Sequence, residues 1–253
     1  MGSLVFRIAG SGGGSSTCAD GSWVTGKVGS YGLSFPGTTN TDQVVVSTHT
    51  STEFGNSDDF SVACWVKSVA DSTYSGFVAK NTTDGLGDYE GWLLGQWADN
   101  KMFFSPRDGL AAARGFVYTN SAVDGNWHHL VGIRDGTTKL SRLYLDGVLQ
   151  TDSTTAAMAD SGEDLLLGQY WNYSTQYCMN GSIDEVGIWN VVLDSGAISD
   201  LYNSGTGNAA SNVSSSALVA YYNMEEGAGN GTLTDRTGNG RTGTLTNMDT
   251  GSC

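Results

Sequence analysis

The amino-acid sequence predicts an all-β fold: a two-sheet antiparallel jelly-roll sandwich with one short helix. The 253 residues include 36 glycines but only 2 prolines, and 10% are aromatic. This combination is typical of short strands joined by tight turns. Segments in which apolar and polar residues alternate recur along the chain, and one segment has helical spacing instead.

The strand pattern is clearest at residues 60–69, which read FSVACWVKSV. Phe60, Val62 and Cys64 fall on one face of this segment, and Ala63 and Trp65 fall on the other. Because both faces are apolar, the segment is predicted to be a strand in the middle of a layered sandwich.

Similar patterns predict the remaining strands. The dipeptide Asp146-Gly147 is a hairpin signal, because a type I′ turn needs a positive φ at both central residues. Trp65, Trp127 and Trp189 lie in regular strands and are assigned to the core. The other predicted strands are residues 44–46, 76–80, 92–97, 102–105, 116–119, 127–134, 140–146, 165–168, 182–189 and 218–224.

One helix is predicted at residues 194–205. Asp194 or Ser195 is a suitable N-cap. Ile198 and Leu201, together with Tyr202, form one apolar face, and Gly205 suits the left-handed position that ends a helix.

The charge balance excludes some partners. The formal net charge is −14, and only 12 Lys and Arg residues are present, whereas nucleic-acid binding needs clustered basic residues. No apolar run approaches the ~20 residues of a membrane span. We therefore expect no nucleic-acid partner and no insertion into a membrane.

Several segments, in order, carry a family resemblance. They are residues 26–35 (GKVGSYGLSF), 60–66 (FSVACWV), 127–134 (WHHLVGIR), 143–147 (LYLDG), 166–169 (LLGQ) and 181–190 (GSIDEVGIWN). Together they resemble laminin-G-like jelly rolls of the concanavalin A-like lectin/glucanase superfamily. The expected location of the protein is outside the cell or on a virion surface.

The resemblance also implies a domain organisation. Residues 1–17 are expected to be a flexible N-terminal arm, and residues 18–253 a single laminin-G-like jelly roll. Residues 218–248 look like the family's opening strand, which normally precedes the GKVG segment. We predict that residues 218–253 supply this strand to the same domain; the alternative is the start of a second, truncated repeat.

The sequence gives no sign of catalysis. Retaining glycosidases need two carboxylates ~5–5.5 Å apart, and in jelly-roll glucanases these resemble an ExDxE or ExDxxE pattern on one strand. No Glu in the chain is followed two residues later by Asp. We therefore predict that the protein is not an enzyme, with a glucanase as the least favoured function.

The favoured function is a non-catalytic recognition module that binds glycans. The loop at residues 169–178 is rich in aromatic residues, which commonly mark binding surfaces. The predicted ligand-binding residues are Trp171, Asn172, Tyr173, Tyr177 and Trp97. The alternative is a subunit of a virion or extracellular assembly, such as a phage decoration, fibre or filament protein, whose partners are other copies of itself.

The resemblance further implies a structural Ca²⁺. Asp184 matches a position that often binds Ca²⁺ beside the opening strand in related jelly rolls, with Glu225 or Glu226 as a second ligand. Carboxylate oxygens suit this hard cation. The alternative role for Asp184 is to cap a turn or accept backbone N–H groups.

The chain ends carry two further predictions. Cys18 and Cys253 are predicted to form a disulfide that joins the ends of the chain, and a Cys64–Cys178 pair is left open. Residues 4–8 (LVFRI), followed by a glycine-rich stretch, are predicted to pair with a neighbouring subunit as an assembly arm. The alternative is an edge strand of their own sheet.

Overall fold

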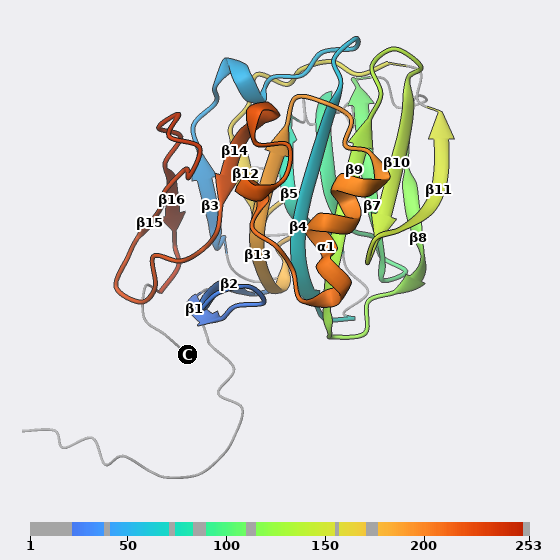
Figure 1. Cartoon of the computed structure of the whole chain (residues 1–253). Coiled ribbons are helices and arrows are strands. Elements are labelled where there is room, and N and C mark those ends of the chain that lie inside the picture. The colour runs from blue at the N-terminus through green and yellow to red at the C-terminus, as the bar shows by residue number, and fades with distance from the viewer. Residues whose placement is uncertain are drawn as a thin grey trace, which may run out of the picture.

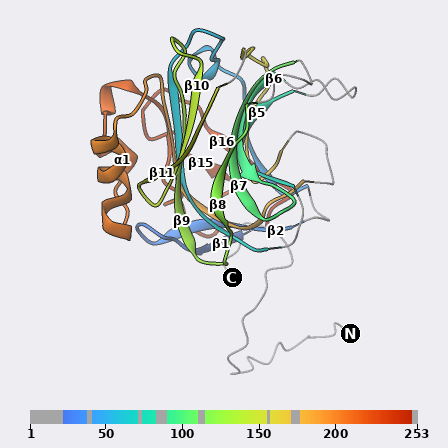
Figure 2. The same ribbon diagram turned by 90° about the vertical axis from the view of Figure 1, so that its right-hand side faces the viewer.

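The computed structural model describes residues 22–37, 41–70, 74–82, 90–109, 115–154, 157–170 and 177–249. It confirms the predicted fold class: two antiparallel sheets pack face to face, and one short α-helix lies outside them (Figure 2). None of the helices in the described ranges is long and apolar enough to cross a membrane.

The first sheet, sheet A, contains eight strands (Figure 1). The type I′ turn predicted at Asp146-Gly147 joins two of them, with φ of 51° and 78°. In order of pairing the strands are β1 (Ser22–Thr25), β2 (Tyr31–Pro36), β13 (Asn180–Trp189), β4 (Phe60–Ser68), β9 (Trp127–Arg134), β10 (Leu140–Leu145) and β11 (Val148–Thr154), and β14 (Leu218–Tyr222) also pairs with β13.

The second sheet, sheet B, also contains eight strands and lies behind sheet A in Figure 1. Their order is β15 (Thr232–Leu233), β16 (Gly243–Thr246), β3 (Gln43–Val46), β12 (Leu165–Leu167), β5 (Ser75–Asn81), β6 (Glu90–Gln96), β7 (Lys101–Asp108) and β8 (Val117–Ala122).

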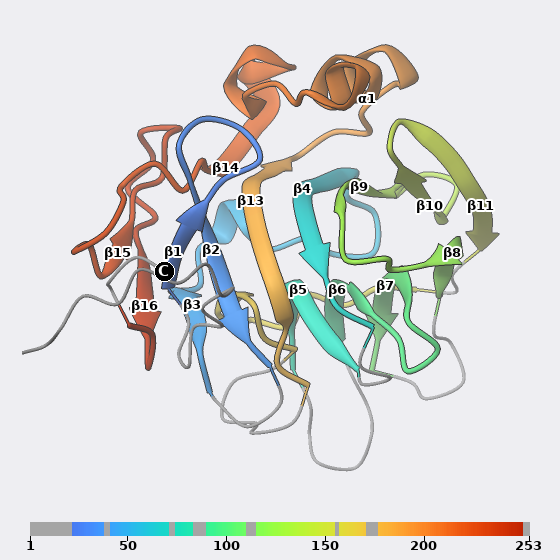
Figure 3. The same cartoon turned by 90° about the horizontal axis from the view of Figure 1, so that it is seen from below.

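The main core lies between the sheets. Phe60, Val62 and Cys64 point into it from β4, as their alternation predicts, while Ala63 joins a second apolar cluster on the outer face of sheet A. The helix α1 (Ser195–Tyr202) covers that outer face (Figure 3). The central strands of sheet A are therefore buried on both faces, and the outer face of sheet B is the one that no described helix covers (Figures 2 and 3).

The C-terminal segment contributes strands to both sheets. Strand β14 lies antiparallel to β13, with Tyr222 opposite Val186, and β16 lies antiparallel to β3, with Gly243 opposite Val46 (Figure 1). Residues 218–246 therefore belong to the same sandwich as the strands that precede them.

Some local predictions needed correction. Asp194 caps α1 through a 2.8 Å hydrogen bond from the Ala197 N–H, but the left-handed residue that ends the helix is Asn203, two positions before the predicted Gly205. Trp127 is only partly buried, because it begins its strand. Strands β1, β2, β11, β15 and β16 were not predicted as strands.

Candidate functional site

Aromatic rings gather on the outer face of sheet B. Phe103 on β7 points outward while Phe104 beside it points into the main core, as alternation requires. Phe116 and Tyr118 reach the same outer face from the start of β8. We call the full set the aromatic cluster; it consists of Tyr74, Trp97, Phe103, Phe116, Tyr118, Tyr170 and Tyr177.

Trp97 lies at the centre of the aromatic cluster. Its ring centroid is 4.5 Å from that of Tyr74, 4.8 Å from that of Phe116 and 6.0 Å from that of Tyr118. These contacts are near-perpendicular, the geometry that aromatic quadrupoles favour. All four rings are only partly buried, so the cluster presents ring surface to solvent.

The cluster unites two of the predicted ligand-binding residues. Tyr74 lies between Trp97 and Tyr177, with centroid distances of 4.5 and 5.8 Å. Trp171, Asn172 and Tyr173 lie outside the described residues. The sequence prediction missed Tyr74, Phe116, Tyr118 and Tyr170, although residues 116 and 118 share one face by period two.

Arg107 places a positive charge inside the cluster. Its guanidinium carbon lies 5.2 Å from the Phe116 ring centre and 5.3 Å from that of Tyr170, and its Nε donates to Ser105 Oγ at 3.1 Å. Cation–π contacts of this kind hold the rings in place. Burial, reinforced by the nearby Asp99 charge, raises the pKa of the Tyr118 hydroxyl, which therefore remains a hydrogen-bond donor.

The predicted metal residues lie elsewhere, at the turn between β1 and β2. Asp184 is fully buried, and its Oδ2 accepts the N–H groups of Lys27 and Val28 at 2.8 and 2.9 Å. Its Oδ1 accepts the Glu185 N–H at 2.8 Å. Glu225 Oε1 caps the other end of the turn, accepting from Ser30 and Tyr31.

The turn explains the glycines of the GKVG segment. A Cβ at Gly29, where φ is 71°, would lie 2.2 Å from Glu225 Oε1. The carboxylate can approach the backbone only because the side chain is missing. Asp184 and Glu225 thus hold the same turn from opposite sides.

Glu185 faces away from its neighbour Asp184. It occupies a bulge in β13 with φ of 52°, and its Oε2 accepts the Tyr221 hydroxyl at 2.6 Å. Burial raises the pKa of Asp184 to about 8 and that of Glu185 to about 7. The two carboxyl groups have separate hydrogen-bond partners.

The donors around Asp184 and Glu225 fit the alternative role, backbone N–H capping, better than they fit a cation. The described ranges contain no group of three or more His, Cys, Asp or Glu side chains that could hold a metal. Glu226, the other proposed ligand, pairs with Arg236 at 2.9 Å. The structural Ca²⁺ stays a prediction.

A chelator measurement tests that prediction. If Ca²⁺ binds only the folded state, a chelator should lower the melting temperature of the wild type. Asp184→Ala should remove this sensitivity, whatever its own effect on stability. A wild type that neither responds to the chelator nor contains metal by elemental analysis would show that the N–H groups alone hold the turn.

Of the four cysteines, the structure describes Cys64 and Cys178. Cys64 and Cys178 are both buried and are not joined to each other; Gln169 Nε2 donates to Cys178 Sγ at 3.3 Å. Burial raises the pKa of the Cys64 thiol, which makes it a poor nucleophile. Cys18, Cys253 and the predicted arm at residues 4–8 lie outside the described residues, so both of those predictions stay open.

Comparison with known proteins adds a family match. The family described as the Concanavalin A-like lectin/glucanases superfamily matches residues 38–199. No match to a curated protein sequence was found.

Solved structures share the fold at low sequence identity. The binding domain of Paraclostridial Mosquitocidal Protein 1 aligns with a TM-score of 0.57 at 15% identity, over 74% of this chain and 46% of its own. A putative carbohydrate binding protein from Bacteroides ovatus gives 0.54 at 15% identity, over 85% and 60%. The CBM40 domain of the Ruminococcus gnavus IT-sialidase, bound to α2,3 sialyllactose, gives 0.51 at 15% identity, over 66% and 94%. The chain spans less than two thirds of the first two structures.

Proposed function

The chain belongs to the Concanavalin A-like lectin/glucanases superfamily, and we propose that it is a non-catalytic glycan-binding module displayed outside the cell or on a virion surface. The aromatic cluster on the outer face of sheet B carries the proposal. Large, partly exposed aromatic rings are frequent anchors in binding surfaces. The flat face of such a ring suits the C–H face of a sugar.

The structural neighbours support a binding role. They are the binding domain of a mosquitocidal protein, a putative carbohydrate binding protein and a sialidase CBM40 domain bound to sialyllactose. The carboxyl groups support the non-catalytic part of the proposal. The sequence has no ExD pattern, and Asp184 and Glu185 are engaged by different partners.

The test replaces one ring of the cluster. Tyr118→Ala should weaken binding to the glycans selected on an array at least about tenfold, since truncating an anchor side chain commonly costs this much. Tyr118 is preferable to Trp97 because it lies at the margin of the cluster. Isothermal titration calorimetry measures the change.

Tyr31→Ala is the matched control. Tyr31 is the same residue type, is 36% exposed and lies on sheet A, outside the cluster. Its replacement should leave glycan affinity unchanged. Equal losses of affinity in both variants would contradict the aromatic cluster as the binding surface. A wild type that polymerises in light scattering and binds no glycan would instead favour the assembly subunit.

A further inference from the structure

A groove of about 440 Å³ lies beside the aromatic cluster on the outer face of sheet B. Gln43, Val45 and Ser47 line it from β3 and the residue that follows, and Thr244 and Thr246 line it from β16. Register places Thr244 opposite Val45 and Thr246 opposite Gln43, while Val44 and Val46 point into the core. The groove is therefore built by the outward side chains of two paired strands.

Most residues that line the groove carry a polar group, and the lining is nearly free of charge. Hydroxyl and amide groups predominate, Val45 is the apolar lining residue, and the charged one is Asp164. The Thr48 N–H donates to Asp164 Oδ1 at 2.9 Å and fixes that carboxylate at the rim. With a chain net charge of −14, a polyanion would be repelled here, whereas a neutral ligand rich in hydroxyl groups finds both donors and acceptors.

The groove is continuous with the aromatic cluster. Val45 packs against the cluster's apolar base, and a row of paired residues crosses the sheet from it through Leu166 and Ala79 to Leu93. Strands β3 and β7 are four steps apart in the sheet. At about 4.8 Å per step, Val45 on β3 and Phe103 on β7 are roughly 19 Å apart, so the far side of the cluster is more than a single sugar ring away from the groove.

We propose that the groove is a second sugar subsite and that the ligand is a neutral, extended oligosaccharide lying across the strands of sheet B. This inference rests on the proposed glycan-binding function. One part of the chain-like ligand stacks on the aromatic cluster, and a part several units away hydrogen-bonds in the groove.

The experiment uses the neutral homo-oligosaccharide series, from disaccharide to hexasaccharide, whose members bind on the array. Wild-type affinity should rise with length. The double variant Thr244→Val/Thr246→Val removes two groove hydroxyls and keeps the β-branched shape of both side chains. It should weaken hexasaccharide binding about tenfold and change disaccharide binding less than twofold.

Two variants separate the possible failures. Thr25→Val makes the same change at an exposed residue of β1 on sheet A and should alter neither affinity, while Tyr118→Ala should weaken both. Equal wild-type affinity for short and long chains, an unaffected double variant, or exclusive selection of charged glycans overturns the groove proposal alone. A wild type that binds no glycan overturns the proposed function and the groove with it.

Discussion

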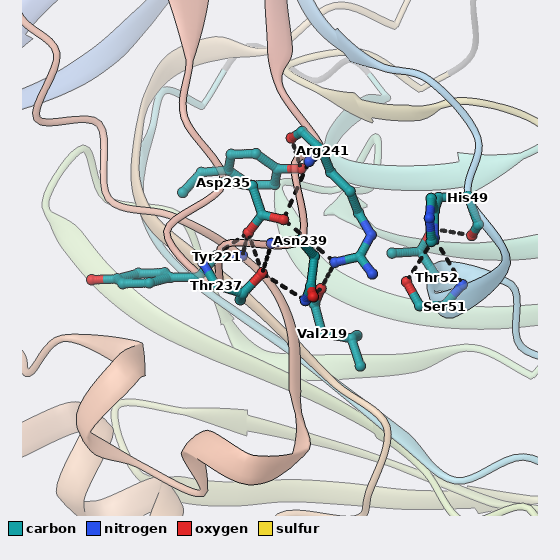
Figure 4. A network of polar contacts seen from close by, with 10 residues as sticks. His49, Ser51, Thr52, Val219, Tyr221, Asp235, Thr237, Asn239 and Arg241 are labelled. Atoms are coloured by element: carbon teal, nitrogen blue, oxygen red, sulfur yellow. Dashed lines mark hydrogen bonds and ion pairs between the residues drawn. The ribbon is translucent and has the colours of Figure 1, made fainter.

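Replacing Asp235 with alanine should lower the free energy of unfolding by about 3–5 kcal/mol, because it leaves a buried charge without its partner. The Asp235 carboxylate is fully buried and lies 3.4 Å from Nη1 of Arg241, whose side chain is 5% exposed (Figure 4). Its Oδ1 also accepts the backbone N–H of Tyr221 at 3.3 Å and both donors of Thr237, at 3.0 and 2.7 Å.

These bonds explain why one carboxylate matters so much. Arg241 also donates to the carbonyl of Val219, so Asp235 and Arg241 together fasten the loop before β16 to strand β14 (Figure 4). Without Asp235, the loop loses its bond to the Tyr221 N–H, and only the bond from the Arg236 N–H to the Tyr221 carbonyl, at 2.8 Å, still joins it to that residue. Strand β16 is one of the two paired strands that line the groove. Asp235→Ala should therefore also weaken the binding of long glycans.

Asp58→Ala is the matched control for this measurement. Asp58 also accepts a loop N–H, that of Gly55 at 2.7 Å, but it is exposed and has no buried cation to compensate. Its loss should cost about 1 kcal/mol, the value of an ordinary hydrogen bond. Urea titration followed by tryptophan fluorescence measures both variants. If Asp235→Ala costs no more than Asp58→Ala, the buried ion pair does not hold the C-terminal segment.

Much of the fold could be predicted because its signals are local. Period-two alternation fixes both faces of β4 from sequence alone, and Asp146-Gly147 reports its own turn. The short strands β1 and β2 have no such local signal. Their conformation depends on carboxylates from Asp184 and Glu225, more than 150 positions away in the chain.

The candidate site was harder to predict for the same reason. Trp97 and Tyr177 attract attention as aromatic residues near loops, but the ring between them, Tyr74, belongs to a third segment. Alternation shows that residues 116 and 118 share a face; it does not show which face of the sheet a helix covers. Asp184 had two alternative roles in the sequence, and the positions of the Lys27 and Val28 N–H groups favour capping.

Gly168→Ala should be strongly destabilising, costing about 2–4 kcal/mol. Gly168 has φ of 81°, and a Cβ there would lie 2.2 Å from Cε1 of Phe35, a ring buried in the main core. The left-handed backbone and the overpacked core both oppose the methyl group. Gly168 also donates to the Phe77 carbonyl at 3.0 Å and accepts the Met179 N–H at 2.8 Å.

The hydrogen bonds with Phe77 and Met179 tie Gly168 to two residues of the main core, and the aromatic cluster begins two residues later, at Tyr170. Gln169 and Cys178 form a bridge directly after Gly168, so both ends of the segment that carries Tyr170 and Tyr177 depend on its position. The structure therefore predicts a second effect of Gly168→Ala. At a temperature where the variant is still folded, displaced cluster rings should weaken glycan binding.

Gly125→Ala separates the contact from the backbone strain. Gly125 has nearly the same φ, 80°, but nothing lies within 4 Å of the position that a Cβ would take there. It should therefore cost only about 1 kcal/mol, the strain of a left-handed residue with a side chain, and leave glycan affinity unchanged. The difference between the two variants measures the packing of Phe35 against Gly168. Equal losses of stability in the two variants would mean that the core around Phe35 rearranges readily to accept the methyl group. Unchanged glycan binding in Gly168→Ala would mean that the cluster rings keep their positions independently of Gly168.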